Sequence, residues 1–193
     1  MTRIIGGTAK GRTLRVPEQG TRPTSDRVRE AVFSSLEHRL GGFHGVCIWD
    51  LYAGSGAFAL ESLSRGARRA VAVERDRAAL AIIRANAETC RLPLEIVQAD
   101  VSKFVALAPS PAPDLVFADP PYELPAAELR EVLTTLLGQM PDHEVLLVIE
   151  RAARDRESAI PDGCTDIDIR KHGETAVTYA HWYGYPHDGS APA

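Results

Sequence analysis

The chain has few cysteines and no long apolar run. Its 193 residues include three widely spaced cysteines, Cys47, Cys90 and Cys164, with no C-x-x-C pair among them. This usage predicts reduced thiols rather than a disulfide framework. No segment approaches the roughly 20 apolar residues of a membrane span, and the amino terminus does not resemble a signal peptide. We therefore expect a cytoplasmic protein that makes no contact with a membrane.

Metal-ligand spacing and internal repeats are also missing. The six histidines show none of the short, regular separations that place several ligands around one metal ion, so no metal is expected. The length suits one α/β domain with a real core and leaves little room for a second full domain.

Charge is unevenly distributed along the chain. The net charge is −4, which by itself disfavours a nucleic-acid enzyme. Residues 1–30, however, hold seven basic and three acidic residues, so the remainder is strongly acidic. Two short β-like runs near Gly6, Gly7 and Gly11 predict that this basic segment is a hairpin. A basic arm for phosphates on an acidic body is one interpretation, and a solvated charged terminus is the other.

A strand, a glycine turn and a helix follow one another in the first half of the chain. The apolar run Val46–Tyr52 leads into Gly54 and Gly56, and the next residues have helical character. This order is typical of the first unit of a doubly wound nucleotide-binding fold. Glu74 ends the next strand-like run, twenty positions after Gly54, where such folds place a carboxylate for ribose hydroxyls.

A dinucleotide oxidoreductase would share this pattern, since Gly54, Gly56 and Ala59 satisfy G-x-G-x-x-G/A. Asp50 argues against that alternative, because a carboxylate at the end of the first strand disfavours a diphosphate and favours an ammonium or sulfonium ligand. S-adenosylmethionine therefore fits this turn better than NAD.

A second motif, Asp119-Pro120-Pro121-Tyr122, follows the apolar run Asp114–Ala118. Two prolines end the strand, because they fix two φ angles and remove two amide donors. Asp119 and the Pro120 carbonyl can accept the hydrogens of an exocyclic amine, and Tyr122 offers a ring on which a base can stack. A proline-terminated strand before an ordinary loop is the alternative.

Four groups of residues together resemble a known family. The chain resembles the ribosomal RNA small-subunit methyltransferase D family of class I S-adenosylmethionine-dependent methyltransferases. The resemblance covers nearly the whole chain and rests on Arg3–Gly7 with Lys10–Arg12, Arg22–Thr24 with Arg29–Phe33, Asp50–Gly56 with Glu61 and Ser64–Ala67, and Asp119–Tyr122.

The resemblance implies an activity and a set of roles. The activity is methyl transfer from S-adenosylmethionine to the exocyclic N2 amine of a guanine in small-subunit ribosomal RNA, of the guanine 966 type, leaving S-adenosylhomocysteine. It implies cofactor contacts at Thr24, Asp50, Gly54, Gly56, Glu74 and Asp100, although Asp50 could instead serve a helix start and Asp100 could cap a helix. The catalytic set would be Asp119, Pro120 and Tyr122, and the RNA contacts Arg3, Lys10, Arg12, Arg15 and Arg22.

The expected fold is a Rossmann-like class I methyltransferase: an α/β, mostly parallel seven-stranded sheet that ends in an antiparallel hairpin. Residues 1–40 would form an RNA-contacting hairpin and helix, residues 41–183 the catalytic domain, and residues 184–193 a disordered tail. The expected helices are 25–39, 60–65, 76–90 and 126–137. The expected strands are 46–52, 69–73, 94–99, 114–118, 143–150, 165–170 and 175–182.

Two other functions remain open on the sequence alone. A DNA adenine or cytosine amino-methyltransferase would carry the same proline motif, but it would also need a sizeable target-recognition region. A non-catalytic RNA-binding module would not need the acceptor motif. We expect a monomer whose partner is small-subunit ribosomal RNA, either free or in an assembling 30S particle.

Overall fold

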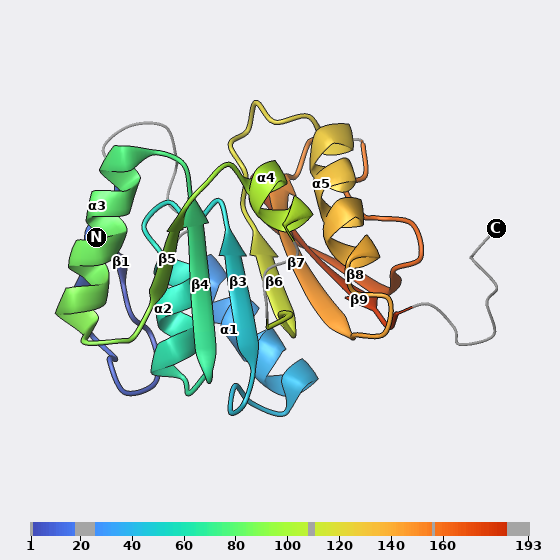
Figure 1. Cartoon of the computed structure of the whole chain (residues 1–193). Coiled ribbons are helices and arrows are strands. Elements are labelled where there is room, and N and C mark those ends of the chain that lie inside the picture. Colours follow the sequence, from blue (N-terminus) through green and yellow to red (C-terminus); the bar gives the residue numbers. More distant parts are fainter. Residues whose placement is uncertain (1, 18–25, 108–110, 156, 185–193) are drawn as a thin grey trace.

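A computed structural model describes residues 2–17, 26–107, 111–155 and 157–184 of the chain (Figure 1). The strands are β1 (Thr2–Arg3), β2 (Thr13–Leu14), β3 (Cys47–Leu51), β4 (Arg69–Glu74), β5 (Glu95–Gln98), β6 (Leu115–Ala118), β7 (Val145–Ala152), β8 (Thr165–His172) and β9 (Thr175–Trp182). The helices are α1 (Asp26–Leu40), α2 (Ala57–Ser64), α3 (Arg77–Cys90), α4 (Val101–Ala106) and α5 (Ala126–Gly138).

The main sheet has seven strands in the order β5-β4-β3-β6-β7-β9-β8. The five strands from β5 to β7 are parallel, and β9 inserts antiparallel between β7 and β8. The chain runs outward from β3 to β5 and then crosses back to β6 on the other side of β3. Such a reversal leaves a crevice at the carboxyl ends of the two central strands, where doubly wound sheets bind ligands.

Apolar side chains cover both faces of the sheet, as expected for buried parallel strands. On one face Trp49 and Val71 pack with α4 and α5, which lie in front of the sheet in Figure 1. On the other face Ile48 and Ala72 pack with Phe33 of α1 and with residues of α2 and α3. The predicted seven-stranded α/β fold with its terminal antiparallel hairpin is confirmed.

Helix ends follow local sequence signals. Asp76 caps α3, because its carboxylate accepts a hydrogen bond from Ala79 N–H at 2.8 Å, and aspartate is among the preferred residues at this position. Helix α2 begins at Ala57, three residues earlier than expected, directly after the left-handed Gly56. Asp100 caps the short helix α4. Helix capping was the alternative to a cofactor contact at this residue.

The amino-terminal hairpin β1–β2 is docked firmly on α2. Glu61 is fully buried, and its carboxylate accepts hydrogen bonds from Ile5 N–H (2.7 Å), Gly6 N–H (2.8 Å) and Arg65 Nε (2.8 Å). At Gly7, with φ +74°, a Cβ atom would lie 1.7 Å from the Ser64 carbonyl oxygen. Only glycine allows so close an approach, so the hairpin has a fixed place on the body.

A side chain of α3 holds the second strand of the same hairpin. Asn86, which is 1% exposed, accepts from Arg15 N–H at 2.8 Å and donates to the Arg15 carbonyl at 2.9 Å. It also donates to the Ser55 carbonyl at 2.9 Å. The hairpin is thereby tied to the glycine turn. Within the described residues, no helix is long and apolar enough to cross a membrane.

Candidate active site

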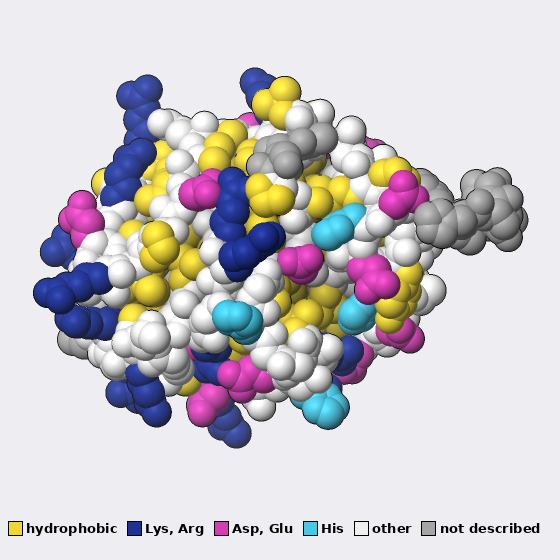
Figure 2. Space-filling view, turned by 60° about the horizontal axis from the view of Figure 1, so that its bottom comes forward, with side chains coloured by type: hydrophobic (Ala, Val, Ile, Leu, Met, Phe, Trp, Pro, Cys, Tyr) yellow, Lys and Arg dark blue, Asp and Glu magenta, His cyan; other side chains and the backbone are white. Residues whose placement is uncertain are grey.

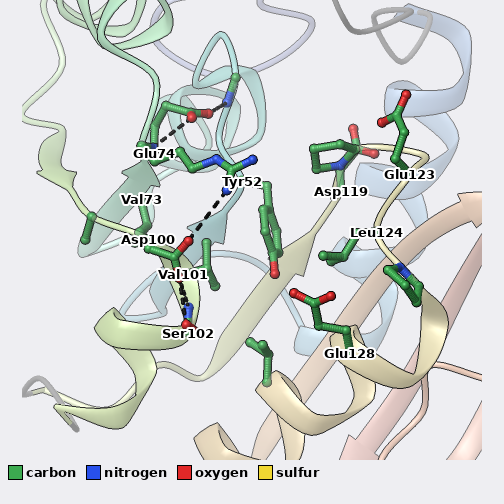
Figure 3. Close-up of a pocket in the computed structure, with 16 residues that line it drawn as sticks. Tyr52, Val73, Glu74, Asp100, Val101, Ser102, Asp119, Glu123, Leu124 and Glu128 are labelled. Atoms are coloured by element: carbon green, nitrogen blue, oxygen red, sulfur yellow. Dashed lines mark hydrogen bonds and ion pairs between the residues drawn. The ribbon is translucent and has the colours of Figure 1, made fainter.

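A cavity of about 410 Å³ opens at the carboxyl edge of the sheet, at the point where the strand order reverses. Side chains that follow four parallel strands meet there, because the ends of parallel strands share one edge (Figure 3). The lining residues that follow these strands are Tyr52 and Gly54 after β3, Glu74 and Arg75 at the end of β4, Ala99 and Asp100 after β5, and Asp119 and Pro121 after β6.

The turn after β3 is built from left-handed residues. Tyr52, Gly54 and Gly56 have φ values of 64°, 56° and 74°. At Gly56 an added Cβ would lie 3.2 Å from Ile83 Cγ2, so both the backbone angle and the packing favour glycine there. Tyr52 has no such freedom, and a bulky residue at positive φ stores strain of about 1–3 kcal/mol.

Asp50 lies behind this turn and does not line the cavity. It is 2% exposed, and its Oδ2 accepts a hydrogen bond from Ala59 N–H in the first turn of α2 at 3.1 Å. Burial raises the pKa of Asp50 to about 8, with a further increase from the charge of Glu74, while the bond from Ala59 acts in the opposite direction. Asp50 therefore contacts the start of α2, which is the alternative to a cofactor contact that the sequence left open.

Glu74 joins the ends of β3 and β4. Its Oε2 accepts from Gly54 N–H at 3.0 Å, and its Oε1 accepts from Arg75 N–H at 2.8 Å and Asp76 N–H at 2.9 Å. Each carboxylate oxygen can accept about two hydrogen bonds. Oε2 therefore keeps capacity for one further donor, such as a ribose hydroxyl.

Asp100 also faces the cavity while it caps α4. Its Oδ1 accepts from Ser102 N–H at 3.0 Å and from Ser102 Oγ at 2.6 Å. These bonds, the side-chain bond from Ser102 foremost, lower the pKa of Asp100. Its Oδ2 lies 3.7 Å from Arg75 Nη1, and both residues line the cavity.

The proline motif forms the opposite wall. Strand β6 is fully buried, and Asp119 and Pro121 line the cavity directly after it. Pro120 is buried, whereas Tyr122 is 53% exposed and does not line this cavity. The Tyr122 ring is therefore not part of the apolar core.

The cavity is strongly acidic. Among the described residues, five carboxylates line it and only one cationic side chain, Arg75, counters them. The acidic residues are Glu74, Asp100, Asp119, Glu123 and Glu128. An excess of carboxylates attracts a cationic ligand and repels a diphosphate.

Comparisons with known proteins identify the family of the chain. A family model described as conserved hypothetical protein 95 matches residues 2–181. Ribosomal RNA small subunit methyltransferase D of Escherichia coli K12 is 36% identical over 82% of this chain and 79% of its own length. The Bacillus subtilis protein YlbH is 32% identical over 91% of this chain and 95% of its own. The chain belongs to the ribosomal RNA small subunit methyltransferase D family.

Solved structures confirm the fold expected of this family. A hypothetical protein from Thermus thermophilus matches with a TM-score of 0.79 and 31% identity, covering 93% of this chain and 98% of that chain. A methyltransferase named yhhF, from Escherichia coli, matches with a TM-score of 0.74 and 30% identity, covering 95% of this chain and 98% of that chain. The Rossmann-like class I methyltransferase fold is thus shared over nearly the whole length.

The structure of this methyltransferase D family member brings together four of the residues singled out in the sequence: Gly54, Glu74, Asp100 and Asp119 line one cavity. Gly56 shapes the turn from below, next to Ile83. Arg3 and Lys10 line a separate hollow of about 380 Å³, and Arg12 and Arg15 are exposed on the hairpin. Arg22 and Thr24 lie outside the described residues.

Several lining residues were not singled out in the sequence. Tyr52 is half-buried in the cavity, where burial raises its pKa to about 12, and Glu128 belongs to the first turn of α5. Arg75 follows Glu74 directly. A positive φ at a tyrosine and the approach of α5 toward β4 are tertiary features, so no local sequence pattern marks these residues. No group of three or more His, Cys, Asp or Glu side chains within the described ranges is arranged to hold a metal ion.

Proposed function

We propose that this protein transfers a methyl group from S-adenosylmethionine to the exocyclic N2 amine of a guanine, of the 966 type, in small-subunit (16S) ribosomal RNA. The observation that carries this proposal is the single acidic cavity that joins Gly54, Glu74 and Asp100 with Asp119 at the reversal of strand order. The names of relatives in the methyltransferase D family support the choice of small-subunit ribosomal RNA as substrate.

The residues present fit S-adenosylmethionine. The left-handed Gly54 and Gly56 let the backbone approach a ligand closely, and the remaining acceptor site of Glu74 Oε2 suits a ribose hydroxyl. Asp100 would meet the adenine amine, and Thr24 the carboxylate end of the cofactor. Asp50 would act on the ammonium group indirectly, because a bound cation favours its charged form.

The charge of the cavity supports this cofactor over NAD. Five carboxylates against one arginine among the described lining residues would repel a diphosphate, whereas the sulfonium and ammonium groups of S-adenosylmethionine carry positive charge. The carboxylates thus contribute to both affinity and selectivity.

The target amine needs help to react, because its lone pair is delocalised into the guanine ring. In our proposal, Asp119 and the Pro120 carbonyl accept its two hydrogens and favour a pyramidal nitrogen. The exposed Tyr122 ring stacks on the base and fixes its plane. Bound S-adenosylmethionine supplies the electrophilic methyl group.

Positioning and charge then drive the transfer. A nitrogen–carbon bond forms as the sulfur–carbon bond breaks, and the positive charge passes to the amine. The Asp119 carboxylate lies on the same wall of the cavity and stabilises that charge. The methylated aryl ammonium is strongly acidic, so its proton leaves readily to water or to Asp119.

RNA would reach this site along the basic hairpin. The proposed contacts are the phosphates facing Arg3, Lys10, Arg12, Arg15 and Arg22. The side chains of Glu61, Ser64 and Asn86 accept hydrogen bonds from backbone amides of this hairpin and hold it in a fixed place. The cations of the hairpin therefore act as a preorganised surface. Free ribosomal RNA and an assembling 30S particle are both compatible with such a surface.

The test is methyl transfer in vitro with labelled S-adenosylmethionine. We expect incorporation into small-subunit ribosomal RNA as 2-methylguanine, with none into DNA of matched sequence. Asp119→Ala serves as the inactive control, and calorimetry with S-adenosylhomocysteine and NAD checks the cofactor. Methylated adenine or cytosine in DNA, or tight binding of NAD alone, would overturn the proposal.

A further inference from the structure

The amino-terminal hairpin does not make up the whole basic surface of the protein. Lys171 and His172 end β8, directly before the β8–β9 turn at Gly173 and Glu174. They line a hollow of about 420 Å³ together with Arg27 and Val28 of α1. Arg27 also lines the hollow that contains Arg3 and Lys10. The two hollows therefore share Arg27, and their lining residues come from parts of the chain far apart in sequence.

This surface lies at the same edge of the sheet as the active site. Strand β6 pairs in parallel with β7, with Ala118 opposite Ile149, so Asp119 and the carboxyl end of β7 share one edge. The β8–β9 turn lies there too, because Ala153 N–H donates to the Glu174 carbonyl at 2.7 Å. The hollow beside Lys171 thus opens next to the strand ends that carry the proline motif.

The cations of the two hollows differ in how far they are neutralised. Arg3 lies 3.8 Å from Asp26, which also pairs with the buried Arg29. Lys10, Arg27 and Lys171 form no ion pair with any described residue. Glu30 is the second carboxylate of this surface. These three cations, which have no ion-pair partner among the described residues, are available to an anionic partner, and Asp26 is already engaged.

His172 adds a second, independent observation. Its Nε2 atom is buried and has no hydrogen-bond partner among the described residues. A buried polar atom without a partner is unfavourable, so native structures usually supply one. His172 also lines the hollow, so a rotation of its ring toward the hollow would expose Nε2 to an RNA hydroxyl or phosphate oxygen and supply the missing partner.

We propose that the β8–β9 turn and the start of α1 form a second RNA-binding surface, in which Arg27, Lys171 and His172 bind the backbone of the substrate RNA. The basic hairpin and this turn then hold the strand at two places near the acceptor motif, and the target guanine is presented between them. This inference rests on the proposed function, because it assumes that RNA is the substrate.

The test compares two double variants that remove the same charge. Arg27→Gln with Lys171→Gln removes the two unpaired cations of the surface. Arg68→Gln with Arg130→Gln is the matched control, since Arg68 precedes β4 at the opposite edge, Arg130 lies on α5, and both are exposed without an ion pair among described residues. Binding of a small-subunit ribosomal RNA fragment is measured over a series of salt concentrations.

We expect the test variant to bind RNA about tenfold more weakly. Its slope of log K against log[salt] should fall by about 1.4–1.8, because each phosphate contact contributes about 0.7–0.9. The control should shift neither value by a comparable amount. Affinity for S-adenosylhomocysteine should be unchanged in both, which shows that the fold is intact. His172→Ala in the wild-type background should also weaken RNA binding.

The outcomes separate this inference from the proposed function. If the wild-type protein methylates ribosomal RNA while the test and control variants bind it equally well, the second surface is wrong and the function stands. If the wild-type protein neither binds nor methylates ribosomal RNA, the proposed function fails and this inference fails with it.

Discussion

The two sides of the carboxyl edge carry opposite charge. The cavity between β3, β4, β5 and β6 is lined by five carboxylates and one arginine, whereas the neighbouring hollows contain Lys10, Arg27 and Lys171 without ion-pair partners among the described residues. Figure 2 shows another face of the molecule, on which dark-blue side chains gather at the left, the side on which Figure 1 shows α3 and β1, while magenta and cyan side chains lie mainly toward the centre and right.

In the proposed function, this separation lets a chain with a net charge of −4 act on RNA. An acidic cavity suits a cationic cofactor, and a basic surface suits a polyanion. For ligand choice, the local distribution of charged side chains therefore matters more than the net charge of the chain.

The largest expected effect is on catalysis. Asp119→Ala should lower the single-turnover methylation rate by about 100-fold or more, as when one preorganised polar contact is deleted. Affinity for S-adenosylhomocysteine should change little. Asp119→Asn keeps an acceptor oxygen and loses the charge, so partial activity would indicate that hydrogen-bond geometry dominates. An undiminished rate in Asp119→Ala would show that the acceptor site lies elsewhere.

The next effect concerns cofactor affinity. Glu74→Ala should weaken binding of S-adenosylhomocysteine by about 1.5–3 kcal/mol, the range for a hydrogen bond to a charged group. Glu131→Ala, on the exposed face of α5, is the control that removes the same charge away from the cavity. Calorimetry measures both. Equal affinity of the two variants for S-adenosylhomocysteine would show that Glu74 does not contact the cofactor.

The buried Asp50 predicts a pH dependence of stability. Its folded pKa of about 8 lies above the unfolded value of about 3.9, so the folded state holds the proton more tightly. This group's contribution to the free energy of unfolding is fully present below about pH 4. It then falls by about 1.4 kcal/mol per pH unit up to about pH 8.

Urea unfolding of the wild type and of Asp50→Asn between about pH 5 and pH 9 measures this effect. Because asparagine does not titrate, the stability of the variant relative to the wild type should rise with pH across this window. A constant difference would mean that Asp50 is ionised throughout. Saturating S-adenosylhomocysteine should reduce the pH dependence, since its ammonium group favours the charged form.

The smallest effect on RNA binding is expected at Arg3, because it has a carboxylate neighbour among the described residues, whereas Lys10, Arg12 and Arg15 have none. Neutralising Lys10, Arg12 and Arg15 together should lower the salt slope of RNA binding by about 2–3. Arg3→Gln alone should lower it by less than one contact, because Asp26 already lies 3.8 Å from its guanidinium. RNA titrations at several salt concentrations check both. If the salt slope of RNA binding is unaltered in the triple variant, the hairpin cations do not contact RNA and the hairpin is only a solvated surface.

The fold was largely predictable because its signals are local. The buried strands, the Asp76 cap and the glycine turn each follow from short patterns. The four lining residues Gly54, Glu74, Asp100 and Asp119 follow strand ends, and parallel topology alone brings strand ends together. The sequence therefore suffices to predict that residues at these positions line a common site.

The remaining features depend on contacts between distant segments. The strained Tyr52, the position of Glu128 and the pairing of Arg3 with Asp26 arise only when the elements pack. The sequence predicted the antiparallel hairpin of β8 and β9, but it did not predict that the turn of this hairpin lies near Arg27. Burial of Asp50 behind the turn likewise required the packing of α2 on β3.

The most direct test is to map methylated nucleotides in small-subunit ribosomal RNA from cells that lack this protein. Complementation with the wild type and with Asp119→Ala would be compared by mass spectrometry of RNA fragments. We predict that one 2-methylguanine is lost in the deletion strain, returns with the wild type and stays absent with Asp119→Ala. An unchanged methylation pattern in the deletion strain, or full restoration by Asp119→Ala, would contradict the assignment of this site and this substrate.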